Sequence, residues 1–193
     1  MDMPTTIFGE SPEIRLRQTT LCDLDFVIRV ESKEENIKFI IPWQRGKHES
    51  AINNEDIAHI IIEDKETNYP LGFMIIAGLQ NPNQSIEFMR IVITEKGKGV
   101  GREALKLIKK WVFEELNANR LWLDVKANND RAKSVYELEG FSIEGTLREC
   151  LKIGDEFESL ILMSILRSEY EYNKRIGGKG REGSSRPWNI HAK

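Results

Sequence analysis

The stretch "TEKGKGVGREALKLI", residues 94–108, places three glycines on alternate positions between an apolar run and a helical run. Glycine lets the backbone take left-handed conformations and lets a ligand approach it closely. The first turn of a helix carries free N–H groups and the positive end of the helix dipole, so it attracts anions. Gly97, Gly99 and Gly101 therefore predict a turn that binds a pyrophosphate group at the start of a helix. The alternative is a tight loop whose glycines only cap that helix.

Two common phosphate-binding motifs do not fit this stretch. A P-loop requires G-x-x-x-x-G-K-[ST], which the chain lacks, and a Rossmann fingerprint requires G-x-G-x-x-G after the first strand of its domain. Here the spacing is G-x-G-x-G, well into the chain. The basic residues Lys96, Lys98 and Arg102 lie among the glycines and just after them, which favours an anion site over a simple cap.

The segments on either side predict a mixed α/β domain. Alternating or apolar runs predict strands at residues 13–17, 57–62, 71–77, 86–93, 120–125, 141–149 and 157–166. Apolar positions at helical spacing predict helices after Thr20, from Arg102 to Leu116 and over residues 128–140. Pro42 and Gly46 interrupt residues 38–50, which show no regular pattern. The order is an antiparallel meander followed by strand–helix–strand–helix–strand, which is the α/β class with a mixed sheet.

The composition is that of a soluble globular protein. The 193 residues are 40% hydrophobic and 31% charged, and the net charge of −3 gives no sign of general nucleic-acid binding. Six basic residues and one acidic residue fall in 173–193, which leaves −8 for the rest of the chain. An acidic body suits a cationic substrate, although solubility alone would also explain it.

The cysteines and the termini favour a cytoplasmic protein. Cys22 and Cys150 form neither a metal-binding spacing nor a disulfide framework. The first residues lack the features of a signal peptide, and the apolar run 57–62 is far too short to span a bilayer. We expect no metal site and no membrane partner.

Three parts of the chain are expected from these patterns. Residues 1–12 form an N-terminal extension and residues 13–170 form one domain. Residues 171–193 form a flexible, basic, glycine-rich tail, which is either native or a remnant of cloning.

Two motifs together resemble the GNAT family (Gcn5-related N-acetyltransferases). "KGKGVG" at 96–101 resembles the family's pyrophosphate loop, Q/R-x-x-G-x-G/A, with Lys96 in the first position. The segment "NDRAKSVYELEGF" resembles the family's N-x-x-A-x-x-x-Y-x-x-x-G-F, with matches at Asn129, Ala132, Tyr136, Gly140 and Phe141. Within the family, "IEFMRIVI", "RLWLDV" and "EGTLRE" resemble the RimJ/RimL-like branch and its small-molecule relatives.

The resemblance implies a GNAT fold, which is a central, mostly antiparallel, twisted sheet with flanking helices. It also implies acetyl-CoA as co-substrate, a primary amine as acceptor, and no metal. The strands at 86–93 and 120–125 are expected to splay apart, so that the pantetheine arm pairs with the first of them. The implied cofactor-binding residues are Ile91, Val92, Ile93, Lys96, Gly97, Lys98, Gly99, Val100, Gly101, Arg102, Asn129, Ala132 and Tyr136. Asn129 has the alternative of acting only as a helix N-cap.

Two residues are candidates for the chemistry. The resemblance places Tyr136 beside the thioester sulfur, where its hydroxyl would donate to the leaving thiolate; by itself, a tyrosine on an apolar helix face is usually a core residue. Glu87 is a candidate proton acceptor for the amine, because strand alternation puts it on one face with Met89, Ile91 and Ile93. An ordinary polar strand residue is the alternative for Glu87. A main-chain N–H near Val92 is a candidate donor to the oxyanion.

Acceptor contacts are expected in the irregular segment. Trp43, Gln44 and His48 lie where the family has its variable substrate loops, whereas His59 lies among aliphatic residues and is expected to be structural.

The predicted function is direct transfer of acetyl from acetyl-CoA to a primary amine of a small molecule or to a protein N-terminus. One alternative is a module that binds acetyl-CoA as a sensor without turnover. Another is a ribosome- or RNA-associated protein that uses the basic tail. The closing strands would also allow a homodimer.

Overall fold

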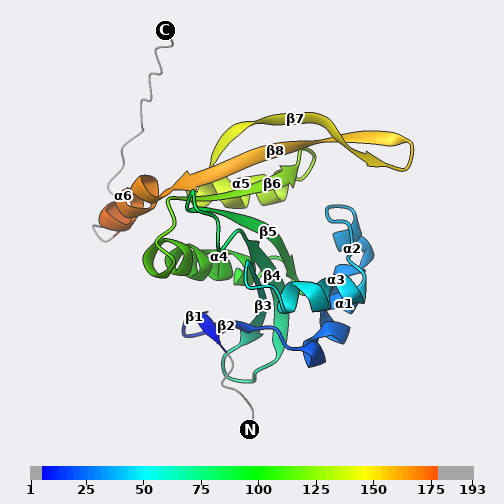
Figure 1. The fold of residues 1–193 in the computed structure, drawn as a ribbon, viewed down its shortest axis with the longest axis horizontal. Coiled ribbons are helices and arrows are strands. Elements are labelled where there is room, and N and C mark those ends of the chain that lie inside the picture. The colour runs from blue at the N-terminus through cyan, green and yellow to red at the C-terminus, as the bar shows by residue number, and fades with distance from the viewer. Residues whose placement is uncertain (1–5, 178–193) are drawn as a thin grey trace.

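The computed structural model describes residues 6–177, which form one eight-stranded sheet and six helices (Figure 1). The strands are β1 (Ile7–Glu10), β2 (Ile14–Gln18), β3 (Ile57–Asp64), β4 (Pro70–Ala77), β5 (Ser85–Ile93), β6 (Arg120–Lys126), β7 (Ser142–Ile153) and β8 (Glu156–Leu166). The helices are α1 (Leu24–Glu31), α2 (Glu34–Ile37), α3 (Arg45–Ile52), α4 (Val100–Lys110), α5 (Asp130–Leu138) and α6 (Arg167–Gly177). The α/β class and the mostly antiparallel sheet are confirmed.

The sheet is joined in its middle by a short parallel contact. Its strand order is β1-β2-β3-β4-β5-β6-β8-β7, and every neighbouring pair except β5 and β6 is antiparallel. The parallel pairs are Ser85 with Arg120, Ile86 with Leu121 and Glu87 with Trp122. Beyond these three pairs the two strands separate, as the family resemblance implies, and leave a gap between the two halves of the sheet.

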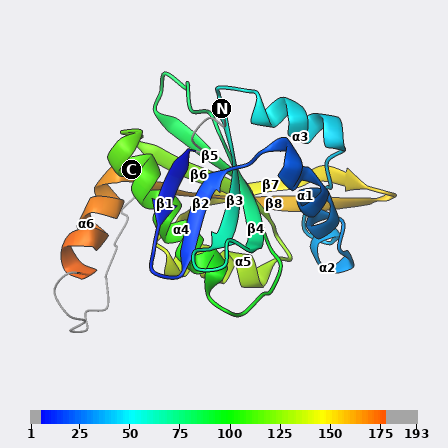
Figure 2. The same ribbon diagram turned by 90° about the horizontal axis from the view of Figure 1, so that it is seen from below.

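Helices cover both faces of the sheet (Figure 2). On one face, α4 and α5 pack on the larger core, with Leu105 and Ile108 fully buried. On the other face, α1 buries Val27 and Val30 against β3, β4 and β5. No helix among residues 6–177 is long and apolar enough to cross a membrane.

A bulge interrupts β5 next to the gap. Ile76 of β4 faces Phe88 and Ile75 faces Arg90, so Met89 has no partner across the strands. An extra residue reverses the side-chain alternation beyond it. As a result Ile91 joins the larger core with Phe88, whereas Met89 contacts the smaller core.

Several boundaries differ from the sequence prediction. Residues 7–10 form β1 and pair with β2, so the sheet begins within the expected extension 1–12. Residues 171–177 are helical, as the second half of α6, and the remainder of the expected tail lies outside the described residues. The basic side chain of Lys174 pairs with Glu114 at 2.6 Å, which helps to hold this helix on the domain.

Two helical segments also differ. Residues 45–52 form α3 despite Gly46, because Ala51 and His48 bury one side of the helix. The predicted helix from Arg102 to Leu116 is α4 followed by a π-helical turn, in which Leu116 N–H donates to the Trp111 carbonyl at 3.0 Å.

Strands β7 and β8 extend beyond the rest of the sheet as a two-stranded arm that passes above α2 in Figure 1. Its apolar side chains are largely exposed, among them Phe157, Ile143 and Leu147. The inner end of the arm borders the gap between β5 and β6, where Leu160 and Leu151 contribute to the cavity described next.

Candidate active site

A cavity of about 650 Å³ opens where β5 and β6 separate. Its walls come from β5, the glycine turn, α4, β6, α5, the segment after α2 and the β7–β8 arm. Most of the predicted cofactor-binding residues line it, namely Ile91, Val92, Ile93, Lys96, Gly97, Gly99, Val100, Gly101, Arg102, Asn129, Ala132 and Tyr136. One edge of residues 91–93 pairs with β4, and the other edge faces the gap, where an extended ligand has room to pair with it.

The glycine turn has the conformation that its sequence predicts. Gly97 and Gly99 have φ values of 92° and 84°, a left-handed region that side chains with a Cβ rarely adopt. Gly99 is the N-cap of α4, and a Cβ at either glycine would meet no atom within 4 Å. The turn therefore needs glycine for its backbone shape, and open space remains beside the free N–H groups of α4.

Basic side chains surround this turn, and they differ in part from those that the sequence predicts for the cavity. Lys96 and Arg102 line the cavity, and so does Arg131 of α5, which the sequence analysis did not select. Arg102 also pairs with Glu139. Lys98 does not itself line the cavity, but it pairs with the exposed Glu95, which does. Lys96 has its pKa lowered by burial, which Glu35 partly offsets.

Asn129 has the capping role that was its alternative. Its side-chain oxygen accepts a hydrogen bond from Ala132 N–H at 3.2 Å at the start of α5. Asn129 also lines the cavity, so a contact with the cofactor stays a prediction.

Tyr136 lies on the cavity wall formed by α5. Its ring packs against Phe88 at 6.2 Å and Phe141 at 5.7 Å between ring centroids. Burial and, secondarily, the charge of Asp124 raise the pKa of Tyr136. The phenol is therefore protonated at neutral pH and able to donate a hydrogen bond.

The strand alternation that supported Glu87 is wrong beyond residue 88. Because Met89 forms a bulge, Ile91 and Ile93 lie on the side of Phe88, opposite Glu87. Glu87 does not line the cavity, and burial followed by the charge of Asp124 raises its pKa. Its role as proton acceptor stays a prediction that this geometry does not favour.

Two carboxylates line the cavity: Glu95, which pairs with Lys98, and Asp124 of β6. Its neighbours Leu123 and Val125 are buried in the larger core, so its side chain points to the opposite face. Among residues 6–177, no ion pair or hydrogen bond engages its side chain. Partial burial raises its pKa, which makes it more basic than an ordinary aspartate. The sequence signal was a lone acidic residue on the predicted strand 120–125 that borders the gap.

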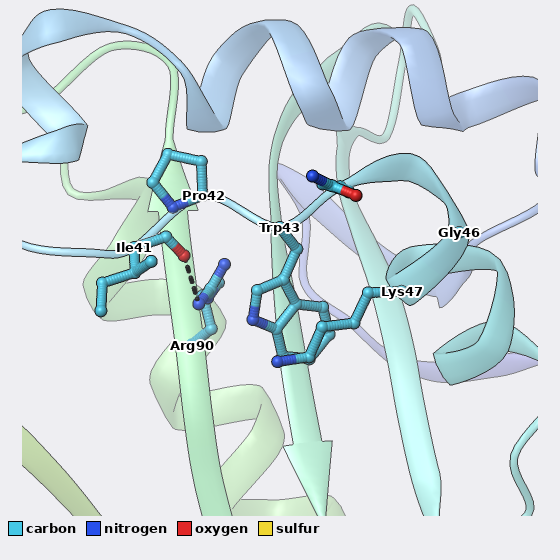
Figure 3. A pocket seen from close by; sticks show the side chains of 7 residues that line it. Ile41, Pro42, Trp43, Gly46, Lys47 and Arg90 are labelled. Atoms are coloured by element: carbon cyan, nitrogen blue, oxygen red, sulfur yellow. Dashed lines mark hydrogen bonds between the residues drawn. The ribbon is translucent and has the colours of Figure 1, made fainter.

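A second hollow adjoins the cavity and shares Ile41 and Arg90 with it (Figure 3). Trp43, Gln44 and Lys47 complete its wall. The Lys47 ammonium lies 4.0 Å from the centroid of the Trp43 ring, and the Arg90 guanidinium lies 4.7 Å from the same centroid. The structure therefore brings Trp43 and Gln44 together at a surface that a ligand can reach.

His48 does not belong to that surface. Its side chain is 0% exposed and lies beneath Trp43, between Glu31 and His59. The prediction that His48 contacts the acceptor is wrong because α3 turns this side chain toward β3. The structural role expected for His59 agrees with its burial.

The arrangement combines four chemical functions in one place. A helix start with cationic side chains can hold a phosphate group, and the free edge of β5 can pair with an extended arm. The protonated Tyr136 can donate to a leaving group, and the basic Asp124 can accept a proton. Within residues 6–177, no three His, Cys, Asp or Glu side chains meet in a group that could hold a metal ion.

Comparison with known proteins agrees with this arrangement. The family model described as "Acetyltransferase (GNAT) domain" matches residues 13–142. The spermidine N(1)-acetyltransferase of Escherichia coli K12 is 25% identical over 175 residues, which cover 86% of this chain and 92% of that protein. The spermidine N(1)-acetyltransferase of Vibrio cholerae is 27% identical over 169 residues, covering 82% of this chain and 95% of that one.

Solved structures share the fold. The crystal structure of spermidine N-acetyltransferase from Vibrio cholerae in complex with CoA and spermine superposes with a TM-score of 0.75 and 24% identity. The match covers 83% of this chain and 99% of that chain.

Proposed function

Since the chain belongs to the GNAT acetyltransferases and is an acetyl-CoA-dependent N-acetyltransferase, we propose that its acceptor is a small polyamine-like amine. The observation that carries the proposal is the carboxylate of Asp124, which opens onto the cavity without a cationic partner among the described residues. A carboxylate in a partly desolvated cavity attracts a cationic amine. The names of the relatives, which act on spermidine, point in the same direction.

Binding of the co-substrate follows from the first wall of the cavity. The α4 N-terminus and Gly99 would hold the pyrophosphate, with Lys96 and Arg131 supplying positive charge. The free edge of residues 91–93 would pair with the pantetheine arm. The thioester would then lie near the bulge at Met89, between Tyr136 and Asp124.

The transfer itself needs the amine, the thioester and a path for protons. The ammonium first gives one proton to Asp124 or to water, and the neutral amine nitrogen then attacks the thioester carbonyl carbon. The nitrogen of the resulting adduct gives up a second proton to water or to the departing thiolate, and it keeps one as the amide N–H. A main-chain N–H near Val92 would donate to the oxyanion. As the C–S bond breaks, the Tyr136 hydroxyl donates a hydrogen bond to the sulfur. Because the pKa of Tyr136 is raised, complete proton transfer from the phenol is uphill, and hydrogen bonding is the role that we assign to it.

A protein N-terminus is the second candidate acceptor, and one observation favours it. Arg90 has five N–H donors, of which one bonds to Glu31 and another to the Ile41 carbonyl at 3.0 Å. Arg90 and Lys47 both line the second hollow. Peptide carbonyl groups would suit these donors, whereas the distal ammonium of a polyamine would be repelled by Lys47.

An acceptor panel separates the two candidates. Release of free CoA thiol is measured with spermidine, spermine, an amino acid, an aminoglycoside and N-terminal peptides. We expect the polyamines to be preferred, and we expect Asp124→Asn to lower their kcat/KM by about 10–100-fold through loss of the proton acceptor. The exposed Asp155, in the turn of the β7–β8 arm, gives the matched control Asp155→Asn.

Each other outcome of the panel decides against the polyamine proposal. Preference for peptides would support the second candidate. Tight binding of acetyl-CoA without amine-dependent release from any acceptor would favour the sensor, and equal losses in the two Asp variants would remove Asp124 from the chemistry.

The glycine turn gives an independent prediction. Gly99→Ala adds a Cβ at φ 84°, which costs about 1–2 kcal/mol in the bound conformation of the turn. The dissociation constant for CoA, measured by calorimetry, should rise by about 5–30-fold. Gly145→Ala is the control, because a Cβ there also meets nothing within 4 Å but needs no left-handed backbone. Unchanged CoA affinity in Gly99→Ala would place the pyrophosphate elsewhere.

Three further features stay proposals. We assign the chain to the RimJ/RimL-like branch on its strand sequences, and to the cytoplasm on its two free cysteines. We also treat residues from β1 to α6 as one catalytic domain, which widens the expected 13–170. The homodimer that the closing strands allow remains untested.

A further inference from the structure

A fully buried carboxylate lies beneath the wall that the two hollows share. Glu31, at the end of α1, is 0% exposed. Its oxygens accept hydrogen bonds from the Arg90 guanidinium and from Trp43 N–H at 2.8 Å, and His48 Nε2 lies 3.1 Å away. Glu31 thereby connects α1, the segment before α3, and the bulged strand β5.

A line of buried polar groups continues from Glu31 into the domain. His48 Nδ1 lies 3.0 Å from His59 Nε2, and His59 Nδ1 lies 2.8 Å from Thr19 Oγ1. All three side chains are buried. This connected line of four side chains is called the Glu31 chain below.

The chemistry of the groups fixes the direction of every hydrogen bond. An ionised carboxylate only accepts, so His48 must donate through Nε2–H, and its Nδ1 must then accept from His59 Nε2–H. His59 Nδ1 is left as an acceptor, which takes the hydroxyl proton of Thr19. Both rings are neutral at pH 7, because burial lowers the pKa of His48 to about 4 and that of His59 to about 3. Every donor along the chain therefore points toward Glu31.

The same carboxylate orients groups that border the acceptor side of the site. Arg90, which it holds, follows the bulge and donates to the Ile41 carbonyl at 3.0 Å, as Figure 3 shows. The Arg90 side chain is only 9% exposed and lies against the Trp43 ring. The position of segment 41–43 relative to the bulge is thus set by hydrogen bonds that converge on Glu31.

A buried carboxylate with several hydrogen-bond partners contributes little to the free energy of unfolding. Desolvation opposes the attraction between buried charges, and well-packed apolar groups often serve stability equally well. Hydrogen bonds, in contrast, fix distances and angles, and an acetyl-transfer site needs its acceptor placed within about 1 Å.

We propose that Glu31 is a positioning residue of the acceptor site, which acts through Arg90 and Trp43 and is itself fixed in orientation by the chain His48–His59–Thr19. The proposal rests on the proposed function only for the identity of the acceptor. It predicts that the Glu31 chain controls acceptor binding and leaves CoA binding alone.

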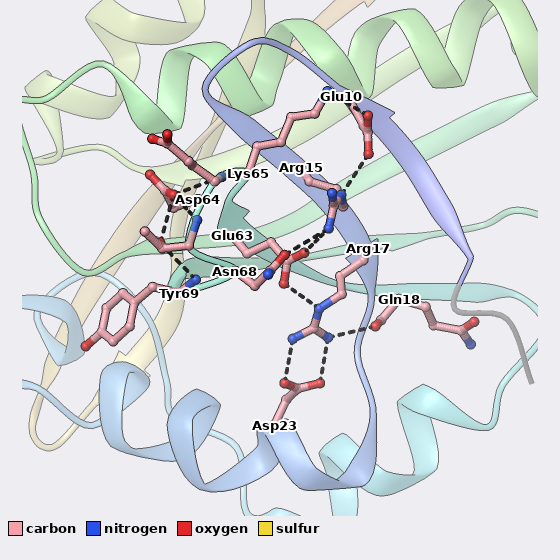
Figure 4. A network of polar contacts seen from close by, with 12 residues as sticks. Glu10, Arg15, Arg17, Gln18, Asp23, Glu63, Asp64, Lys65, Asn68 and Tyr69 are labelled. Atoms are coloured by element: carbon pink, nitrogen blue, oxygen red, sulfur yellow. Dashed lines mark hydrogen bonds and ion pairs between the residues drawn. The ribbon is translucent and has the colours of Figure 1, made fainter. Parts of the chain in front are cut away.

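The first test is Glu31→Gln, with Glu63→Gln as a matched control. Glu63 of β3 is also buried and pairs with Arg15 at 3.0 Å and Arg17 at 2.7 Å on the neighbouring β2 (Figure 4). It lines neither hollow. In Glu31→Gln the acceptor KM should rise by about 10-fold or more with kcat changing less, and the dissociation constant for CoA should stay the same. In Glu63→Gln all three constants should stay close to the wild type.

The second test uses no acceptor, so it is independent of the proposed function. Long-range ¹H–¹⁵N spectra of the histidine rings should show neutral Nε2–H tautomers for His48 and His59 at pH 7. In Glu31→Gln the amide signals of Trp43 and Arg90 should move, and in Glu63→Gln they should not. Thr19→Val should disturb the His59 signal, and Thr19→Ser, which keeps the hydroxyl, should restore it.

The results separate the two proposals. If the tautomers differ from Nε2–H, or if both glutamate variants move the Trp43 and Arg90 signals alike, the positioning role is overturned. If the spectra agree but the wild type acetylates no amine, the proposed function fails and the geometry of the Glu31 chain stands.

Discussion

Replacing Tyr136 by phenylalanine should lower kcat by about 10²–10³-fold while the dissociation constant for acetyl-CoA changes little. The hydroxyl is the group on the α5 wall that can donate to the sulfur, and its raised pKa keeps it protonated. The ring packs between Phe88 and Phe141 by its faces and edges, so phenylalanine preserves that packing. The loss should therefore appear in the chemical step, measured as single-turnover release of CoA.

Tyr170→Phe is the matched control for this experiment. Tyr170 also stacks on a phenylalanine, Phe113, and donates its hydroxyl to Glu114 at 2.6 Å, but it lies on α6, outside the cavity. Its variant should retain the wild-type rate. A Tyr136→Phe enzyme with an unchanged single-turnover rate would show that the thiolate leaves without this donor.

The free energy of unfolding should fall by about 4 kcal/mol between pH 7 and pH 5. In the unfolded chain a histidine takes up its proton near pH 6.5, whereas the buried His48 and His59 stay neutral down to about pH 4 and pH 3. The unfolded state therefore binds more protons in this window, so stability rises with pH and is lost as the pH falls. Lys47 opposes protonation of His48, whereas the Glu31 carboxylate, 3.1 Å from His48 Nε2, favours it. Asp23 favours protonation of His59.

Urea unfolding at pH 7, 6 and 5 measures this loss. Carboxylates such as Asp23 and Glu139 have lowered pKa values, so their contribution is lost only below about pH 4.5 and does not enter the window. His59→Gln removes one of the two buried rings and should roughly halve the dependence on pH. A wild-type stability that is flat from pH 7 to pH 5 would mean that the two histidines already carry protons in the folded protein.

The parts of the site that the sequence revealed are those whose information is local. Gly97 and Gly99 predict a left-handed turn because glycine lacks a Cβ. Tyr136 lies on a helix that the apolar spacing and the capping residues predict. The same holds for the presence of the two strands that flank the gap, because each is a short apolar run that is recognisable without knowledge of distant residues.

The errors arose where long-range packing decides. The alternation that was applied to Glu87 assumed an unbroken strand, and nothing in "IEFMRIVI" marks Met89 as a bulge; only pairing with β4 creates it. His48 was predicted to contact the acceptor because its segment lies where the GNAT family has variable substrate loops. In the structure α3 turns that side chain toward β3, where it contacts Glu31 and His59. The sequence analysis did not select Asp124, because its position at the cavity depends on the separation of β5 from β6.

The three residue pairs between β5 and β6 are also the pivot about which the two strands diverge. From Phe88 to Ile93 the strand runs about 20 Å beyond the last pair, so a rotation of about 5° there moves its far end by about 2 Å. The pivot is held by Arg120, whose guanidinium donates to Ser85 Oγ at 3.1 Å and binds Glu144 on the arm. Ser85 and Arg120 do not line the cavity. A change in the angle between β5 and β6 at these pairs would nevertheless change the width of the gap, most of all at its far end. Substitutions at Ser85 or Arg120 would therefore affect the reaction by changing the angle between β5 and β6. The resulting displacement of β5 increases with distance from the pivot.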